Sequence, residues 1–303
     1  MATMIELKDV KKVFGKQVAV DLSDLRLEQG EIYGLIGPNG AGKSTIMKMI
    51  CGLLEPSSGQ VTVAGVAMSE ANRIGILKQI GSLIEEPAYY DNLTGLENMQ
   101  ILKELKGLTD QDVTEALAIV RLIDHQNKRV KHYSLGMKQR LGIAMAIMGR
   151  PKLIVLDEPT NGLDPQAREE IRKLIRSLPE KFQTTVMISS HALDEIEKMV
   201  TQIGIVGKGK LLYQGTIRQF KSQHSGQICL KTSADDKALA LLKLDASRVQ
   251  VTEQGLMLSN YPDDVVADLV KRLVLADIAV YRIFEVNKSL EELFIDFTAS
   301  DIL

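Results

Sequence analysis

The chain has 303 residues, of which 45% are hydrophobic and 25% charged, and its formal net charge is -2. This length and apolar content allow one large domain or two unequal ones with a sizeable core, which excludes a disordered chain. The near-balanced charge gives no positive field of the kind that nucleic-acid binding requires. Cys51 and Cys229 lie far apart in the sequence and indicate neither a disulfide framework nor a zinc site.

No segment of the sequence predicts a membrane span or a secretory signal. The first eight residues alternate apolar and charged side chains, unlike the apolar centre of a signal segment. The longest apolar stretches, such as residues 141–148, are well short of the roughly 20 residues that a spanning helix needs. We therefore expect the chain not to cross a membrane unaided.

The first part of the chain predicts short strands around a glycine-rich loop. Alternating or apolar runs predict strands at residues 5–10, 22–27, 31–36, 60–63 and 81–84. The strand at residues 31–36 leads directly into the glycine-rich loop, and a helix over residues 43–51 follows that loop.

The middle of the chain is helical in pattern between about residues 91 and 149. Apolar spacing predicts helices over residues 93–105 and 110–123, the second preceded by an N-cap-like threonine. Wholly apolar runs then follow at residues 153–156 and 185–188, with a helix over residues 166–178 between them. Such runs favour central strands of a parallel sheet that is covered on both faces.

The last part of the chain predicts a separate, smaller domain. Residues 221–226 are polar and loop-like, so we place a boundary between residues 1–220 and residues 221–303. The C-terminal part carries no catalytic constellation, and its order of elements is that of a split βαβ, ferredoxin-like α+β unit. The predicted elements are a strand at 227–231, a helix at 235–242, strands at 248–252 and 256–258, a helix at 263–275, a strand at 279–284 and a last helix at 290–297.

The glycine-rich loop at residues 37–45 reads GPNGAGKST and matches the Walker A pattern G-x-x-x-x-G-K-S/T. Small residues let successive backbone N–H groups point at phosphate oxygens, and the following helix adds its positive end. Lys43 supplies a charge to the β- and γ-phosphates, and Ser44 offers its hydroxyl to Mg²⁺. A chance match is the alternative, but the strand before the loop and the helix after it favour a true site. The predicted nucleotide ligands are Gly37, Asn39, Gly40, Ala41, Gly42, Lys43, Ser44 and Thr45.

A second site is predicted where the apolar run at residues 153–156 ends in two acids. A buried strand that ends at Asp157 places a carboxylate where Mg²⁺ or its water shell can sit. Glu158, one residue further, points differently and is the candidate that takes a proton from the attacking water. A strand that merely stops at a polar loop is the alternative. The phosphate loop in the same chain favours the magnesium site.

Four further features, added to the two loops above, make residues 4–220 resemble the nucleotide-binding subunits of ABC transporters. Residues 133–140, YSLGMKQR, are similar to the signature sequence of that family, and residues 161–164, NGLD, to its D-loop. His191 follows a predicted strand as the H-loop histidine of the family does, and Phe14 stands where the family keeps an aromatic that stacks on adenine. The resemblance implies a P-loop ABC ATPase fold: an α/β domain with a mixed sheet core, an antiparallel β part and a helical signature subdomain at about residues 90–150.

The resemblance also implies partners and roles. Ser134 and Gly136 are expected to close over the γ-phosphate of an ATP held by a second copy, in a head-to-tail pair with two ATP molecules, and Asp164 joins the nucleotide-facing residues. His191 is expected to contact the γ-phosphate and to help hold Glu158 and the water in line. Transmembrane permease subunits are the other expected partners. They would place the chain at the cytoplasmic face of the plasma membrane, with ATP and Mg²⁺ as cofactors and no nucleic acid.

Two departures from the family pattern are informative. The usual signature is LSGGQ, and here Met137 replaces the glutamine that contacts the partner's nucleotide. After the strand at residues 81–84 the family has a metal-reaching glutamine, whereas this chain has Glu85, and Gln79 lies before the strand. Glu85 keeps an oxygen for the metal and adds a negative charge near the γ-phosphate, so it is a candidate metal ligand and catalytic group. This glutamate resembles that of lantibiotic-immunity ATPases, and the SLGMKQ segment resembles closely similar bacitracin-type exporters, which implies export of lantibiotic or other peptide antibiotics.

Three other functions are alternatives. The first is the ATPase of a general drug or bacitracin-type exporter. The second is a soluble ABC ATPase that acts on nucleic acid or the ribosome, but the chain has one cassette, no sustained heptads and no basic excess. The third is a P-loop kinase or GTPase, in which the signature segment and His191 have no place.

Overall fold

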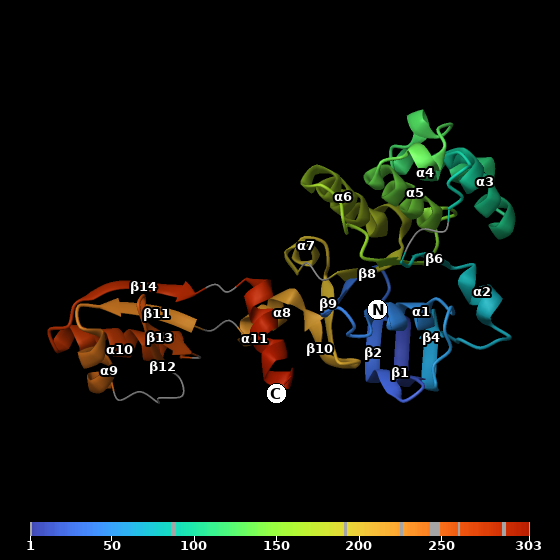
Figure 1. Cartoon of the computed structure of the whole chain (residues 1–303). Coiled ribbons are helices and arrows are strands. Elements are labelled where there is room, and N and C mark those ends of the chain that lie inside the picture. The colour runs from blue at the N-terminus through green and yellow to red at the C-terminus, as the bar shows by residue number, and fades with distance from the viewer. Residues whose placement is uncertain are drawn as a thin grey trace. The chain divides into compact units, whose positions relative to one another are not determined.

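The chain folds into two compact units, residues Met1–Ile217 and Arg218–Leu303 (Figure 1). The structure is a computed structural model, and it describes residues 2–85, 89–190, 193–224, 227–242, 249–259, 261–286 and 289–302. Among these residues, no helix combines the length and the apolarity that crossing a membrane requires.

The first unit begins with an antiparallel sheet in the order β2-β1-β4-β5. Its apolar side chains Ile5, Leu7 and Val10 are fully buried, while charged residues alternate with them, as a strand with one solvated face requires. The first two strands are longer than predicted because the hairpin ladder continues through charged residues to Phe14 and Gln17. The strands are β1 (Thr3–Phe14), β2 (Gln17–Glu28), β4 (Ser58–Val63) and β5 (Val66–Ala67).

The second sheet of this unit has the order β10-β9-β3-β8-β7-β6, and all of its pairs are parallel except that of β10 with β9. Every residue of β3, β7 and β8 is buried, which confirms the prediction of central parallel strands. Because parallel strands end at one edge, the loops after β3 and β7 come together there. The strands are β3 (Ile32–Ile36), β6 (Ile80–Leu83), β7 (Leu153–Asp157), β8 (Thr185–Ser190), β9 (Gln202–Gly207) and β10 (Lys210–Thr216).

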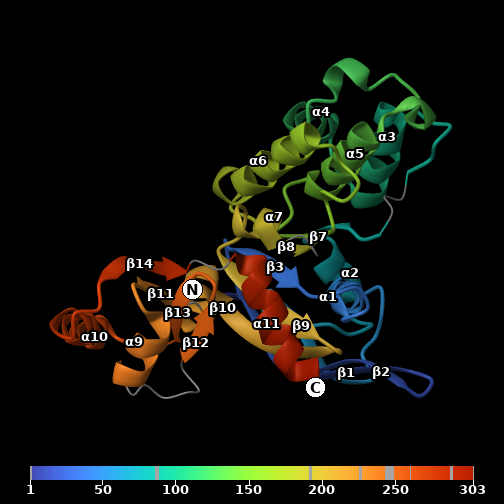
Figure 2. The same cartoon turned by 60° about the vertical axis from the view of Figure 1, so that its left-hand side comes forward.

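Helices α3, α4 and α5 of the first unit lie together, away from β1 and β2 (Figure 1 and Figure 2). Capping boxes at Thr94 and Thr109 start α3 and α4. Helix α4 ends earlier than predicted, because the chain leaves the helix at Val120 and Arg121 has a positive φ of 59°. The helices are α1 (Lys43–Ile50), α2 (Arg73–Leu77), α3 (Gly95–Lys106), α4 (Asp110–Ile119), α5 (Leu135–Ile147), α6 (Pro165–Phe182) and α7 (Leu193–Glu197), with 3-10 turns η1 (Ile123–His125) and η2 (Val130–His132).

The packing of α5 on β6 depends on Gly81, because a Cβ there would lie 1.7 Å from the backbone oxygen of Ala146. We expect Gly81→Ala to lower the free energy of unfolding by about 3 kcal/mol, since the helix backbone must move away from the strand. Gly75→Ala in α2 is the matched control, since nothing lies within 4 Å of its added methyl group. Thermal or urea unfolding measures both, and equal stability of the two variants would contradict this packing.

The second unit is an antiparallel sheet in the order β12-β13-β11-β14 with helices α9 and α10 packed on its core. This strand order is that of a ferredoxin-like unit, as the sequence predicts. The elements are α8 (Ile217–His224), β11 (Gln227–Thr232), α9 (Asp235–Leu242), β12 (Val249–Thr252), β13 (Gly255–Ser259), α10 (Asp263–Leu275), β14 (Val280–Val286) and α11 (Leu290–Ile302).

The predicted loop at residues 221–226 is wrong over its first four residues, because α8 continues to His224. Phe220 anchors this helix: it is fully buried, and its ring meets the ring of Phe297 edge-on at 5.5 Å. This buried aromatic contact stabilises the helix although residues 221–224 are polar. Residues 225 and 226 lie outside the described residues.

Candidate nucleotide site

The phosphate loop, residues 37–45, connects β3 to α1 in a conformation that requires its glycines. Gly40 and Gly42 have positive φ values of 79° and 105°, and Gly42 is the N-cap residue of α1. A Cβ at Gly37 would lie 2.4 Å from the oxygen of Val206, so the loop backbone packs directly against β9. The loop therefore presents backbone N–H groups at a helix N-terminus, which is the arrangement that binds phosphate.

Lys43 is folded back onto the loop. Its Nζ donates hydrogen bonds to the carbonyl oxygens of Gly37 at 2.8 Å and Pro38 at 3.1 Å, and the residue is only 6% exposed. Burial lowers the pKa of Lys43, and the nearby carboxylates of Glu158 and Asp157 act in the opposite direction. A phosphate group bound in the loop would add to the negative charge that stabilises this buried ammonium.

A cavity of about 450 Å³ lies over the phosphate loop. The loop residues that line it are Asn39, Gly40, Gly42, Lys43, Ser44 and Thr45. Gly37 and Ala41 do not line it: Gly37 packs against Val206, and the oxygen of Ala41 accepts a hydrogen bond from Gly209. Phe14 does not line the cavity: it is 51% exposed at the β1–β2 hairpin, with Lys12 Nζ 5.2 Å from its ring centroid. Sequence reasoning missed the other lining residues, Gln17, Val18, Ala19, Lys208 and Gly209.

The sequence contains a signal for two of the missed residues, Lys208 and Gly209. Lys208 and Gly209 form the turn between β9 and β10, and the N–H of Gly209 donates to the oxygen of Ala41 at 3.0 Å. Such a G-K-G turn is a hairpin signal in the sequence. Its place over the phosphate loop depends on β9 pairing with β3, a long-range contact that local patterns do not encode.

Asp157 and Glu158, the two acids at the end of β7, are both hydrogen-bonded to Ser189 of β8. The Ser189 hydroxyl donates a hydrogen bond to the Asp157 carboxylate and accepts one from the Glu158 N–H at 3.0 Å. Asp157 is 8% exposed, and Glu158 has a positive φ of 47°, so their side chains leave the strand in different directions. Sequence reasoning missed Ser189, whose position opposite Asp157 follows only from the pairing of β7 with β8.

A second cavity, of about 710 Å³, brings together the predicted metal ligands and the predicted base. Ser44, Glu85, Asp157 and Glu158 all line it. Hydroxyl and carboxylate oxygens are the ligands that Mg²⁺ prefers, so this donor set fits the ion. Within the described part of the chain, no three His, Cys, Asp or Glu residues form a metal cluster of their own, and oxygens of a bound nucleotide would have to complete the shell. His191 lies outside the described residues.

Glu85 has a positive φ of 61°, and its carboxylate accepts a hydrogen bond from Lys48 Nζ at 2.5 Å. It follows β6 at the edge of the sheet where the phosphate loop and Asp157 lie. Glu85 shares the second cavity with Ser44 and Asp157, and its carboxylate contacts a lysine in this conformation, so its place at the metal stays a prediction.

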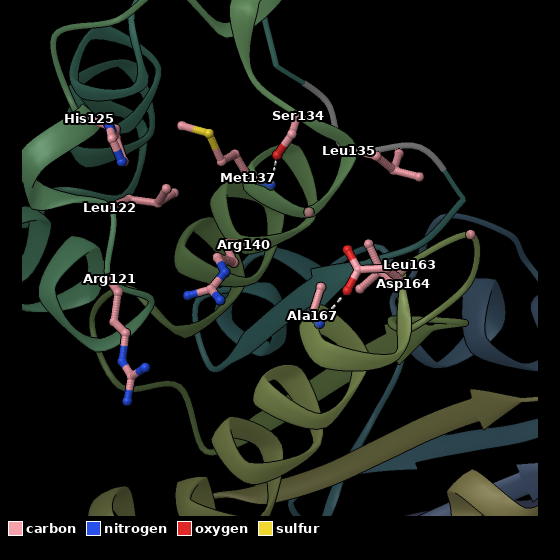
Figure 3. Close-up of a pocket in the computed structure, with 12 residues that line it drawn as sticks. Arg121, Leu122, His125, Ser134, Leu135, Met137, Arg140, Leu163, Asp164 and Ala167 are labelled. Carbon is pink, nitrogen blue, oxygen red and sulfur yellow. Dashed lines mark hydrogen bonds between the residues drawn. The ribbon is translucent and has the colours of Figure 1, made fainter.

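The signature residues line a third cavity, of about 520 Å³, which is drawn in Figure 3. Ser134 is the N-cap of α5 and its Oγ accepts from the N–H of Met137 at 3.3 Å, while Asp164 caps α6 by accepting from the N–H of Ala167 at 2.9 Å. Arg121 and His125 add two exposed basic side chains to this cavity, and sequence reasoning missed both. The signature cavity shares no lining residue with the cavity over the phosphate loop.

The first difference in the signature segment is explained by packing. Tyr133 stands where the family has leucine, and it is 6% exposed with its hydroxyl donating to the oxygen of His125 at 2.8 Å. Tyr133 therefore belongs to the core of the helical part of the unit, and the change leaves Ser134 in place as the helix cap.

The phosphate loop, the acid-tipped β7 and the separate signature helix define an ATP-binding cassette. The family model described as ABC transporter matches residues 20–161. The chain is 39% identical to the bacitracin transport ATP-binding protein BcrA of Bacillus licheniformis over 97% of both chains. It is 41% identical to the lantibiotic transport ATP-binding protein SrtF of Streptococcus pyogenes over 70% of this chain and 90% of that protein. The bacterial ABC transporter cassette MJ0796, solved as a dimer, aligns with a TM-score of 0.66 and 26% identity over 71% of this chain and 99% of that one.

The chain therefore belongs to the ATP-binding proteins of ABC transporters, and it is an ATPase of that family. The ABC ATPase fold that the sequence predicts is that of the family.

Proposed function

We propose that this ATPase drives a permease that exports peptide antibiotics of the bacitracin or lantibiotic type and so gives immunity or resistance. The support is the similarity to BcrA over 97% of both chains, together with the similarity to SrtF over 70% of this chain. The same subunit in a general drug exporter is the second candidate, and the unusual Glu85 favours the peptide-antibiotic group.

The observation that carries the transport cycle is the separation of the two nucleotide-facing surfaces. Ser134 and Gly136, the phosphate-facing residues of the signature segment, line a cavity that contains no residue of the phosphate loop, although other signature residues share a cavity with Ser44. A head-to-tail pair solves this, because Ser134 and Gly136 of each copy then face the nucleotide in the phosphate loop of the other. Two ATP molecules would be enclosed at the seam, and their hydrolysis would release the pair.

The chemistry assigned to the site follows its donor groups. Ser44, Asp157 and Glu85 would hold Mg²⁺, which when bound neutralises charge on the phosphate oxygens. Glu158 takes a proton from the attacking water, and Ser189 fixes the backbone from which its side chain leaves β7. His191 is assigned to the γ-phosphate on the family resemblance alone.

The permease partner is assigned to an apolar groove of about 530 Å³ between β6, α3 and α5. Leu53 and Leu105, which line this groove, are 58% and 78% exposed. Exposed apolar surface of this kind in a cavity marks a binding site for another apolar element. An apolar segment on the cytoplasmic side of the permease fits it, and it would place the chain at that face of the plasma membrane. Ile84, the neighbour of Glu85 in the chain, also lines this groove, so a movement of Glu85 at the nucleotide would be transmitted to the groove.

We expect Leu105→Asp to reduce co-purification of the permease by at least about tenfold, because a charge in the groove would have to be desolvated. The ATPase rate of the isolated subunit should stay within about twofold of the wild type, since Leu105 lines neither nucleotide cavity. Leu275→Asp is a matched control, because Leu275 is also 78% exposed and lies in the second unit. Equal retention of the permease by both variants would contradict the groove assignment.

The second unit is proposed to stabilise the dimer or to regulate it. Its position after the cassette supports this role, and the relative BcrA matches the chain along its full length. Truncation after Phe220 tests it directly, and a truncated chain with unchanged ATPase activity and dimerisation would count against the role.

A further inference from the structure

The negative charge of Glu85 is compensated by a lysine on the phosphate-loop helix. Lys48 lies in the last turn of α1, and its Nζ is 2.5 Å from Glu85 Oε1. Its side chain is 33% exposed, against 64% for Glu85, so the ammonium is the more enclosed partner. Both residues are held by elements that begin or end at the nucleotide site, α1 directly after the phosphate loop and Glu85 directly after β6.

The charges around the cavity make this compensation necessary. Glu85, Asp157, Glu158 and Asp91 line it, and Lys138 is the basic residue among its lining groups. Lys138 is already paired with Asp91 at 3.2 Å and lies 5.4 Å from the centroid of the Tyr89 ring. The negative charge of Glu85 is therefore compensated by Lys48, which does not line the cavity. Without Lys48, an additional carboxylate would face the position of the nucleotide phosphates.

We propose that Lys48 is a positioning residue for nucleotide binding: it holds and neutralises Glu85, so that a carboxylate can stand beside the phosphates without repelling them. The inference rests on the proposed place of Glu85 at the nucleotide. The role of Lys48 depends on the glutamate at residue 85. A glutamine at residue 85 would be neutral and would need no counter-ion. With nucleotide and metal bound, the Glu85 carboxylate would be able to turn from Lys48 to the metal, which would then neutralise its charge.

A second role of Lys48 has to be separated from this one. A cation in the last turn of a helix also stabilises the helix through its C-terminal partial charge. That effect is independent of Glu85, whereas the counter-ion role disappears when Glu85 is neutral. The pair Lys48→Met and Glu85→Gln, combined as a double variant, distinguishes the two roles.

The experiment measures ATP binding to the purified full chain, in EDTA and in Mg²⁺, for Lys48→Met, Glu85→Gln and the double variant. In EDTA we expect Lys48→Met to weaken ATP binding roughly three- to tenfold, the size expected for one uncompensated charge several ångströms from the phosphates at a partly exposed site. The double variant should regain most of the affinity that Lys48→Met loses, because no carboxylate at residue 85 then remains to repel the phosphates. In Mg²⁺ the loss in Lys48→Met should be smaller, because the metal then neutralises Glu85.

Lys78→Met is the control for net charge, because Lys78 is exposed and lines neither nucleotide cavity. Lys48→Arg keeps the cation and should bind ATP as the wild type does. Thermal unfolding of each variant, read by circular dichroism, shows that it is folded at the temperature of the binding assay.

Two results would overturn the role of Lys48. The first is unchanged ATP binding by folded Lys48→Met, and the second is a loss that the added Glu85→Gln fails to restore. Either result leaves the proposed function intact as long as Lys43→Ala still abolishes tight ATP binding in the same assay. Retention of tight binding by Lys43→Ala would instead refute the nucleotide site itself.

Discussion

Replacing Glu158 by glutamine is expected to lower the rate of ATP hydrolysis by about 10²- to 10⁴-fold, the usual contribution of a general base. The amide has nearly the shape of the carboxylate but cannot take the proton of the attacking water. The backbone N–H of residue 158 would still donate to Ser189 Oγ, so the geometry of the loop should be preserved. Steady-state phosphate release by the purified chain measures the effect.

The same variant should still bind ATP and should accumulate as an ATP-held dimer, because closure precedes hydrolysis in the proposed cycle. Size-exclusion chromatography with and without ATP reports this dimer. Adding Ser134→Ala is expected to weaken it, since Ser134 would face the nucleotide of the other copy. Glu180→Gln is a control carboxylate change on α6, because Glu180 is exposed and lines neither the signature cavity nor the two nucleotide cavities. Turnover at the wild-type rate in Glu158→Gln would remove Glu158 from the role of base.

Replacing Lys43 by alanine is expected to weaken ATP binding by about 10²-fold or more. Its ammonium is buried and hydrogen-bonded to the carbonyl oxygens of Gly37 and Pro38, and the phosphates of a bound nucleotide would take over those bonds. Two charge-assisted hydrogen bonds of about 1.5–3 kcal/mol each account for an effect of this size. Fluorescence titration with a nucleotide analogue or calorimetry with ATP measures it.

The control for this variant is Lys16→Ala, in the exposed hairpin between β1 and β2, which removes one positive charge without touching the phosphate loop. Lys43→Arg adds a second test, because it keeps the charge but places a bulkier guanidinium at a buried position. A nucleotide affinity of Lys43→Ala equal to that of the control would show that the loop does not bind phosphate as described.

The local parts of the fold were predictable from the sequence because they depend on patterns within a few residues. The apolar runs that became β7 and β8 and the ranges of α9 and α10 follow from periodicity alone. The phosphate loop follows from glycine spacing, since small residues at fixed offsets are what its conformation requires. The end of α4 and the extent of α8 were wrong, because a positive φ at Arg121 and a buried contact of Phe220 with Phe297 decided them.

The site was predictable only in part, because several of its groups are brought in by strand pairing. Ser189 meets Asp157 through the register of β7 and β8, and the turn at Lys208 reaches the phosphate loop through the pairing of β9 with β3. The contact between Lys48 and Glu85 joins residues 37 positions apart. No local pattern of residue types encodes such contacts, so sequence reasoning named the acids and the loop but not the groups that hold them.

The most direct test of the proposed export function is antibiotic resistance in cells that carry this chain together with its permease. The minimum inhibitory concentrations of bacitracin and of a lantibiotic are measured for the wild type, for Glu158→Gln and for an empty vector. The proposed function predicts that the wild type raises the inhibitory concentration of at least one of these peptides several-fold, while Glu158→Gln, expressed at the same level, gives the value of the empty vector. Equal protection by the wild type and by Glu158→Gln, or no protection by either, would contradict ATP-driven peptide export by this subunit.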